Sequence, residues 1–245
     1  MGKTVLILHG WPQPVTKDSM YYKYFEENGY SVVAPQLFTK DFVLTQEEAK
    51  KYIEAKLAGR KPDVIVGISL GGLLVPVFAK DYPNAKLILI ATGAKLEPQA
   101  TGFRMLLDMA KHRKVLNVLN VIRFLPQKVL FAFYEFINPF RGNEAQREIY
   151  IKDMKDNLKC IVGIPIDEES EIVNFVSSTD NTELLKSLKN KAIIFTSNND
   201  LMMPSNLGQE LHRLLGSSQL VVSDGGHFDV FTQNNFKDLD KFLGN

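Results

Sequence analysis

The segment Gly67-Ile68-Ser69-Leu70-Gly71 places a serine between two glycines in the spacing G-x-S-x-G. An apolar run precedes Ser69 and a stretch with helical periodicity follows it, so the serine is expected on a sharp strand-to-helix turn. Such a turn lifts the hydroxyl above the sheet, and glycines are needed because larger side chains would collide with neighbouring backbone. The pattern predicts a nucleophile, although a glycine-rich turn before a helix would show the same five residues.

A serine nucleophile needs a base, and the base needs an acid to orient it. His227 follows the last predicted strand, and Asp200 follows the strand before it. Taken alone, His227 would be interpreted as a loop histidine whose hydrogen bonds are satisfied. Asp200 alone would be interpreted as a helix cap or a turn residue. Together they give the chain order Ser, Asp, His at the carboxyl ends of three strands, which predicts a catalytic triad.

Two backbone amides are predicted to bind the oxyanion of an acyl-transfer intermediate. The Leu70 amide is adjacent to the nucleophile, at the positive end of a helix. The Trp11 amide lies in His9-Gly10-Trp11-Pro12, directly after the first predicted strand. Gly10 permits close approach there, and His9 is interpreted as a residue that shapes the loop rather than as a base.

Three side chains near these positions are predicted to contact the substrate, namely Trp11, Met202 and Phe228. Trp11 also fits a partly buried aromatic that fills the floor of the pocket, and both roles can hold together. Met202 and Phe228 directly neighbour the predicted acid and base loops.

The elements that must position these residues alternate between strands and helices. Strands are predicted at 5–8, 30–35, 63–68, 86–91, 192–196 and 219–222. Helices are predicted at 18–28, from a Thr45/Glu48 capping box to Gly59, and at 70–82, 204–215 and 231–243. This alternation predicts an α/β protein with parallel crossovers, a mostly parallel open sheet and helices on both of its faces.

Residues 96–189 separate the two strand-rich blocks, and a single crossover needs far fewer residues. Helical spacing recurs at 103–110, 115–125, 129–137 and 143–158, with breaks at Pro126 and Pro139. We therefore predict a core made of residues 1–95 and 190–245. Residues 96–189 are predicted to form a helical cap over the carboxyl edge of the sheet, where open α/β folds bind ligands.

On these motifs the sequence resembles the α/β-hydrolase superfamily with a cap domain, on both sides of the insertion. The resemblance implies that Ser69 is the nucleophile, His227 the base and Asp200 the acid, with Trp11 and Leu70 supplying the oxyanion hole. Members of that superfamily usually carry an antiparallel hairpin ahead of the oxyanion-loop strand. Here that strand begins near Thr4, so the sheet is expected to be shortened to about six strands.

The loop His9-Gly10-Trp11-Pro12 is also similar to the oxyanion loop of epoxide hydrolases and dehalogenases. The nucleophile of those enzymes is an aspartate, and their reactions proceed through an alkyl-aspartate ester. The serine at position 69 therefore argues against both activities.

Composition excludes several other classes. The chain has 245 residues with 29 basic and 28 acidic side chains, so a net charge of +1 gives no general attraction to nucleic acid or to anionic membranes. The single cysteine, Cys160, cannot form an internal disulfide, which fits a cytoplasmic location, and it is expected to be a buried small hydrophobe. No signal sequence, membrane anchor, metal motif or nucleotide-binding loop is recognised, so no cofactor is expected.

The leading hypothesis is a serine hydrolase that cleaves carboxylic esters of small apolar or aryl acyl substrates, as a monomer or a homodimer. The same residues would serve a thioesterase, a lactonase or a carbon–carbon bond hydrolase. An alternative of another class is a noncatalytic small-molecule-binding protein built on the same fold.

Overall fold

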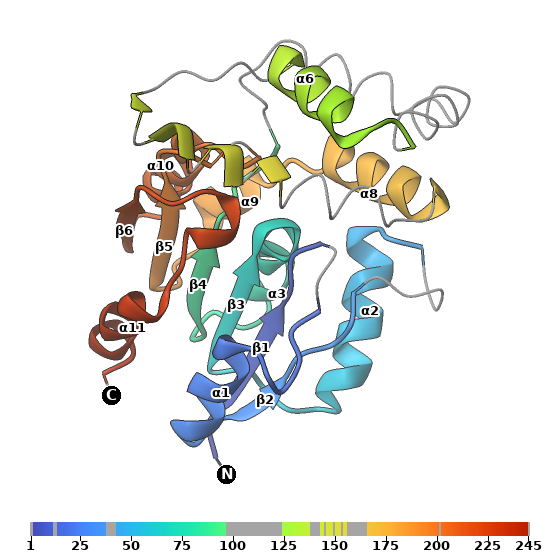
Figure 1. Ribbon diagram of the computed structural model, residues 1–245. Coiled ribbons are helices and arrows are strands. Elements are labelled where there is room, and N and C mark those ends of the chain that lie inside the picture. Colours follow the sequence, from blue (N-terminus) through green and yellow to red (C-terminus); the bar gives the residue numbers. More distant parts are fainter. Residues whose placement is uncertain are drawn as a thin grey trace.

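A computed structural model of the chain describes residues 2–11, 14–37, 43–96, 124–137, 166–200 and 202–244, together with residues 143–155 except 145, 149 and 153. The strands lie side by side in the centre of the molecule with helices on both sides of them (Figure 1). Cys160 lies outside the described residues, so its burial stays a prediction.

The sheet has six strands, and every neighbouring pair in it is parallel. Its spatial order is β2-β1-β3-β4-β5-β6. The strands are β1 (Thr4–Leu8), β2 (Ser31–Val33), β3 (Val64–Ile68), β4 (Lys86–Ile90), β5 (Ala192–Ser197) and β6 (Ser218–Ser223). The prediction of a shortened, mostly parallel α/β sheet is confirmed, and each of the six predicted strands is present.

Helices cover both faces of the sheet, which explains why the inner strands are apolar throughout instead of alternating with polar residues. The core helices are α1 (Met20–Glu27), α2 (Gln46–Leu57), α3 (Val75–Ala79), α10 (Ser205–Leu214) and α11 (Phe236–Leu243). One core cluster joins alternate strand residues, such as Leu6 and Ile65, to α2, α3 and α10. A second cluster joins the intervening residues, such as Val5 and Val64, to α1 and α11.

The segment predicted to be helical at 70–82 is helical as far as Ala79, but it does not form one continuous helix. The chain instead forms a short 3-10 helix, η1 (Ser69–Leu73), and then the five-residue helix α3. Pro76 explains the break, because proline has no amide hydrogen and its ring clashes with the carbonyl four residues earlier in a continuous α-helix. At the second position of α3 the missing hydrogen has no helical partner to lose.

One other predicted helix start needs correction, and one predicted capping box forms only in part. The predicted helix at 231–243 begins only at Phe236, because Thr232 and Asn235 cap a separate 3-10 turn, η3 (Gln233–Asn235). At α2, the Thr45 hydroxyl accepts the Glu48 amide as predicted, at 3.2 Å. The reciprocal half of that capping box does not form, since the Thr45 amide donates to a backbone carbonyl and the Glu48 carboxylate binds a lysine.

The insertion is helical in the part that the structure describes. Helix α6 (Gln127–Ile137) confirms the prediction at 129–137, and the described residues between 144 and 155 are helical as predicted. The helix predicted at 103–110, and all but the last two residues of that at 115–125, lie outside the described residues. Figure 1 shows α6 and α8 beyond the carboxyl ends of the strands.

Helices α8 (Ile166–Ser178) and α9 (Thr182–Ser187) were not predicted. A signal for α8 existed, because Ile172, Phe175 and Val176 have helical spacing and follow an acidic first turn. These three residues and Leu185 of α9 belong to the same core cluster as the sheet. The division of the chain into a core and a cap at residues 95 and 190 therefore stays a prediction.

The strand order fixes where a site can form. The chain leaves β1 toward β2 on one side of it, and β3 returns on the other side. The carboxyl ends of β1 and β3 therefore flank a point where the connections diverge, and a crevice opens at such a point in open α/β sheets. The loops that begin at His9 and Ser69 both start there.

Candidate active site

Ser69 stands directly after β3 in a backbone conformation that residues other than glycine rarely adopt, with φ at +50°. The two glycines of the motif are required by close packing. A Cβ on Gly71 would lie 2.2 Å from the carbonyl oxygen of Leu8, and a Cβ on Gly67 would lie 2.3 Å from a methyl carbon of Val75. The turn after β3 is thus fixed by steric contact with β1 and α3, as the spacing of the motif predicted.

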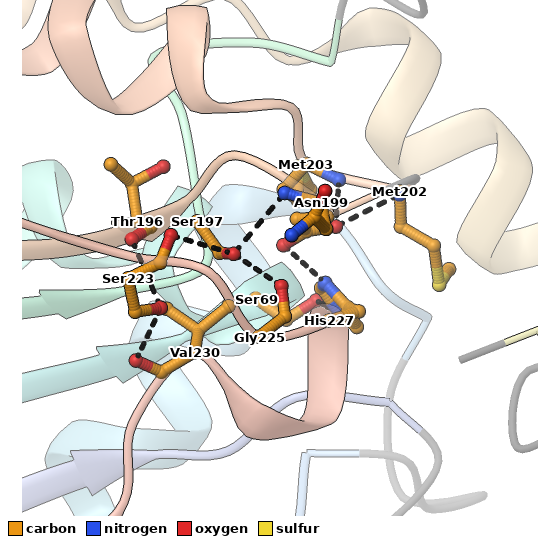
Figure 2. Close-up of polar contacts among 11 residues, drawn as sticks. Ser69, Thr196, Ser197, Asn199, Met202, Met203, Ser223, Gly225, His227 and Val230 are labelled. Atoms are coloured by element: carbon orange, nitrogen blue, oxygen red, sulfur yellow. Dashed lines mark hydrogen bonds and ion pairs between the residues drawn. The ribbon is translucent and has the colours of Figure 1, made fainter. Parts of the chain in front are cut away.

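Ser69, His227 and Asp200 form a continuous chain of two hydrogen bonds, part of which Figure 2 shows. The distance from Ser69 Oγ to His227 Nε2 is 3.0 Å, and that from His227 Nδ1 to Asp200 Oδ2 is 2.8 Å. Nδ1 carries the proton because it faces a carboxylate, so Nε2 has a lone pair for the serine hydroxyl. All three residues are buried. The arrangement can take a proton from Ser69 and stabilise the resulting imidazolium.

The second carboxylate oxygen of Asp200 is held by backbone amides. Oδ1 accepts hydrogen bonds from Met203 at 2.7 Å and from Met202 at 2.9 Å (Figure 2). Hydrogen bonds to an ionised acceptor are about twice as strong as neutral ones, so this turn fixes the rotation of the carboxylate. Oδ2 is then presented to His227.

Of the side chains predicted to contact substrate, two lie beside the hydrogen-bonded residues. The Phe228 ring meets the His227 imidazole edge-on, with ring centroids 5.4 Å apart, and stays 37% exposed. Met202 is half-buried in the turn that binds Asp200. Trp11 is half-buried and packs against the main core cluster. Their contact with a substrate stays a prediction.

The loop after β1 lies against the nucleophile turn. A Cβ on Gly10 would lie 3.1 Å from Ser69 Cβ and 3.2 Å from the Ile68 carbonyl oxygen, so the backbone of this loop approaches Ser69 closely. Leu70 is buried at the start of η1. These positions bring the Trp11 and Leu70 peptide units to the serine, and their role as oxyanion donors stays a prediction.

His9 is buried and holds this loop through both ring nitrogens. Nε2 accepts the Leu37 amide at 2.8 Å, so Nδ1 carries the proton and donates to the Gly10 carbonyl at 2.6 Å. Burial lowers the pKa of His9, and the hydrogen bond to Gly10 offsets this only in part. The neutral imidazole bridges the loops after β1 and β2, which is how it shapes the loop.

Sequence patterns missed the residues that join the acid loop to the base loop. Ser197, at the end of β5, and Asn199 bind backbone carbonyls of the loop that precedes His227. Their only signal in the sequence was a run of small polar residues next to Asp200. Such a run also suits an ordinary turn.

The described residues contain no group of three or more His, Cys, Asp or Glu side chains that could hold a metal ion. None of the helices in the described part of the chain combines the length and the apolar character needed to cross a bilayer.

Solved structures resemble the whole chain. An α/β hydrolase enzyme, MGS-M2, from a Medee basin deep-sea metagenome library matches 100% of this chain and 90% of its own, with a TM-score of 0.69 and 18% identity. A thermophilic esterase from Thermogutta terrifontis matches 99% and 89%, with a TM-score of 0.65 and 22% identity. The chain has the α/β-hydrolase fold. A meta-cleavage product hydrolase from Pseudomonas fluorescens matches 99% and 91%, with a TM-score of 0.61 and 16% identity.

No protein-family model and no curated protein matches the sequence. At these identities the likeness concerns the fold alone, so a role for each residue has to come from the local geometry.

Proposed function

We propose that the chain is a serine hydrolase that cleaves carboxylic esters of small apolar or aryl acyl compounds. The observation that carries the proposal is the buried chain of hydrogen bonds from Ser69 through His227 to Asp200. Its serine lies on a strained turn beside the Gly10 loop, where an oxyanion can be bound. A merely structural serine would not need this geometry.

In the proposed reaction Ser69 Oγ attacks the acyl carbon while His227 Nε2 takes the hydroxyl proton. The carbonyl oxygen becomes an oxyanion, which the Trp11 and Leu70 amides bind. When the intermediate collapses, the bond to the leaving oxygen breaks, and His227 returns its proton to that oxygen to release an alcohol. Water then attacks the acyl carbon while His227 takes one of its protons. The bond from that carbon to Ser69 Oγ breaks, His227 returns the proton to Oγ, and the carboxylic acid is released. Asp200 stabilises the imidazolium in both halves of the reaction.

The substrate class is proposed from the surroundings of the hydrogen-bonded residues. Trp11, Met202 and Phe228 offer apolar surface there, and each is partly exposed. We propose that residues 96–189 act as a cap, because α6 and α8 lie beyond the carboxyl ends of the strands (Figure 1). Uncharged acyl groups fit such surroundings better than polyanions do.

The solved structures support hydrolase chemistry, since those that share the fold include an esterase and an α/β hydrolase enzyme. The likeness to a meta-cleavage product hydrolase keeps carbon–carbon bond hydrolysis as a second candidate. The two differ in the bond that the same serine would cleave.

A fluorophosphonate probe tests the nucleophile without knowledge of the substrate. We expect the folded chain to carry one adduct, on Ser69, and to hydrolyse p-nitrophenyl esters with a preference along a series graded by acyl length. Ser69→Ala is expected to lose both reactions. Ser187→Ala, which removes an exposed hydroxyl bound to a helix carbonyl, is expected to keep both.

Absence of an adduct on folded protein would contradict the proposal and favour a noncatalytic binding role. An adduct without turnover of any ester would direct the search to thioesters, lactones and carbon–carbon bonds, which should be assayed in the same panel. Peptide mapping of the adduct locates it at Ser69.

A further inference from the structure

Ser197 is the last residue of β5, and its side chain is completely buried although the proposed reaction does not use it. Its hydroxyl oxygen lies within hydrogen-bond distance of the Gly225 carbonyl and, at 3.1 Å, of the Ser223 carbonyl. The same oxygen accepts the Asn199 amide at 3.3 Å. Figure 2 shows Ser197 at the centre of these contacts. A hydroxyl with one proton thus joins three backbone groups.

These partners belong to the two loops that carry the acid and the base. Asn199 immediately precedes Asp200, and Gly225 lies two residues before His227. Asn199 adds a second link, since its side-chain amide donates to the Asp224 carbonyl at 2.6 Å. A third link is the Asn198 amide, which donates to the Ser223 carbonyl at 3.0 Å. The loop after β5 therefore holds the loop after β6 just before the two loops reach Asp200 and His227.

These links control the hydrogen bond between His227 and Asp200. The bond from His227 Nδ1 to Asp200 Oδ2 spans 2.8 Å and joins the two loops at their far ends. A relative shift of about 1 Å between positioned groups is enough to cost about a hundredfold in rate. The buried hydroxyl belongs to the last residue of β5. The backbone is anchored at that point, because Ser197 pairs with Ser223 of β6.

We propose that Ser197 is a positioning residue that sets the separation of the Asp200 and His227 loops and thereby the alignment of the imidazole with Ser69. This inference rests on the proposed function. It predicts that the hydroxyl matters for turnover and not only for folding, because it acts on His227 through Gly225 and on Asp200 through Asn199.

The test compares four variants by ester turnover, by fluorophosphonate labelling rate and by thermal unfolding. Ser197→Ala should lower kcat and the labelling rate by about tenfold to a hundredfold while KM stays within about twofold. Ser197→Thr restores the hydroxyl and should recover most of kcat. Ser223→Ala is the matched control, because it removes a neighbouring hydroxyl whose contacts among the described residues are with the Thr196 and Val230 carbonyls (Figure 2). It should keep kcat.

Asn199→Ala is the fourth variant, and it tests the positioning role if Ser197→Ala does not fold. Asn199 is half-buried, so its truncation is expected to leave the fold intact and to lower kcat about threefold to tenfold by removing the second link. The proposal is overturned if Ser197→Ala, per folded molecule, turns over as fast as Ser223→Ala. It is also overturned if Asn199→Ala leaves kcat unchanged where Ser197→Ala does not fold.

An NMR measurement separates failure of this proposal from failure of the proposed function. The Nδ1 proton of His227, assigned by its disappearance in His227→Gln, reports the bond to Asp200 whether or not any ester is cleaved. We expect it in the wild-type chain and in Ser223→Ala, and expect it to broaden or vanish in Ser197→Ala. A resonance unchanged in Ser197→Ala would overturn the positioning role, whereas a wild-type chain that shows the resonance but no labelling would count against the hydrolase alone.

Discussion

The turn after β3 and the paired loops after β5 and β6 hold their side chains by different physical means. Ser69 is fixed by contact: its turn fits between neighbouring backbone only because Gly67 and Gly71 have no side chains. Asp200 and His227 are held by hydrogen bonds. The Met203 amide donates to one oxygen of Asp200, and the Ser197 hydroxyl joins the two loops by binding Gly225 and Asn199. Steric contact fixes Ser69, and polar contact fixes Asp200 and His227.

This difference predicts opposite sensitivities. A change of size at constant polarity should damage the β3 turn, and in the paired loops it should do so only where backbone is equally close, as at Gly225, whose added Cβ would lie 2.4 Å from the Asp229 carbonyl oxygen. A change of polarity at constant size should damage the loops and leave the turn intact. Asp200→Asn and Gly71→Ala each alter one of these properties in one region.

Asp200→Asn should give the largest effect, because it changes polarity in the loops with almost no change in size. The amide offers a donor to His227 Nδ1 and favours the wrong tautomer, so kcat should fall by about 10⁴-fold with little change in fold. Turnover of a p-nitrophenyl ester measures it. Asp224→Asn is the matched control, because that exposed carboxylate accepts only from Asn198 among the described contacts. Equal losses in the two variants would contradict the assigned role of Asp200.

Gly71→Ala should give the next largest effect, because it adds one methyl group to the turn without changing polarity. The new Cβ would meet the Leu8 carbonyl at 2.2 Å, so we expect the free energy of unfolding to fall by about 2–3 kcal/mol. Denaturant titration measures the loss. Gly216→Ala, where a Cβ would have nothing within 4 Å, should be close to neutral. If Gly71→Ala left the free energy of unfolding unchanged, steric contact would not be what fixes the turn after β3.

The same difference decides what the sequence could predict. Steric requirements on a turn leave a fixed pattern of glycines, so the segment around Ser69 was recognisable from its spacing. Asp200 and His227 followed from the order of the strands, because parallel strands deliver their carboxyl ends to one edge. The role of Ser197 depends on which backbone carbonyls face it across two loops, and no local pattern encodes that.

The elements show the same limits. Apolar runs predicted the inner strands because a sheet covered on both faces needs them, whereas the edge strands β2 and β6 also carry polar and exposed residues. The helix predicted at 70–82 is divided into two short helices, because Pro76 cannot continue an α-helix from the residues before it. Helix α8 was missed although its apolar residues have helical spacing, and only their packing on the core depends on the assembled sheet. Local chemistry was thus more predictable than tertiary packing.

His9 tests whether the steric region also contains one polar support. Its folded-state pKa is lowered by burial, so above about pH 6.5 both the folded and the unfolded chain hold it neutral and it adds no pH dependence. Below that value the unfolded chain binds a proton that the folded chain resists, so stability should fall with decreasing pH, by up to about 1.4 kcal/mol per pH unit.

Denaturant titrations from pH 7.5 to 5 should therefore show a steeper loss for the wild-type chain than for His9→Gln. The glutamine can still accept the Leu37 amide and does not titrate. Identical slopes for the two proteins would mean that His9 takes up its proton without strain, and the polar bridge would then contribute little to the loop.

Ser69→Gly should give the smallest effect on the free energy of unfolding, and the informative result is the sign of that change. Compared with Ser69→Ala, which loses the same hydroxyl, the glycine variant relieves the cost of a positive φ and should be more stable by about 1 kcal/mol. Ala55 within α2 and Ala58, which caps its carboxyl end, calibrate the measurement of unfolding free energy. Ala58→Gly, at a φ of +49°, should also stabilise, whereas Ala55→Gly within the helix should destabilise by about 0.5–1 kcal/mol. If Ser69→Gly behaved like Ala55→Gly, the turn would store no strain, and the nucleophile would be held as its partners are, by its hydrogen bond.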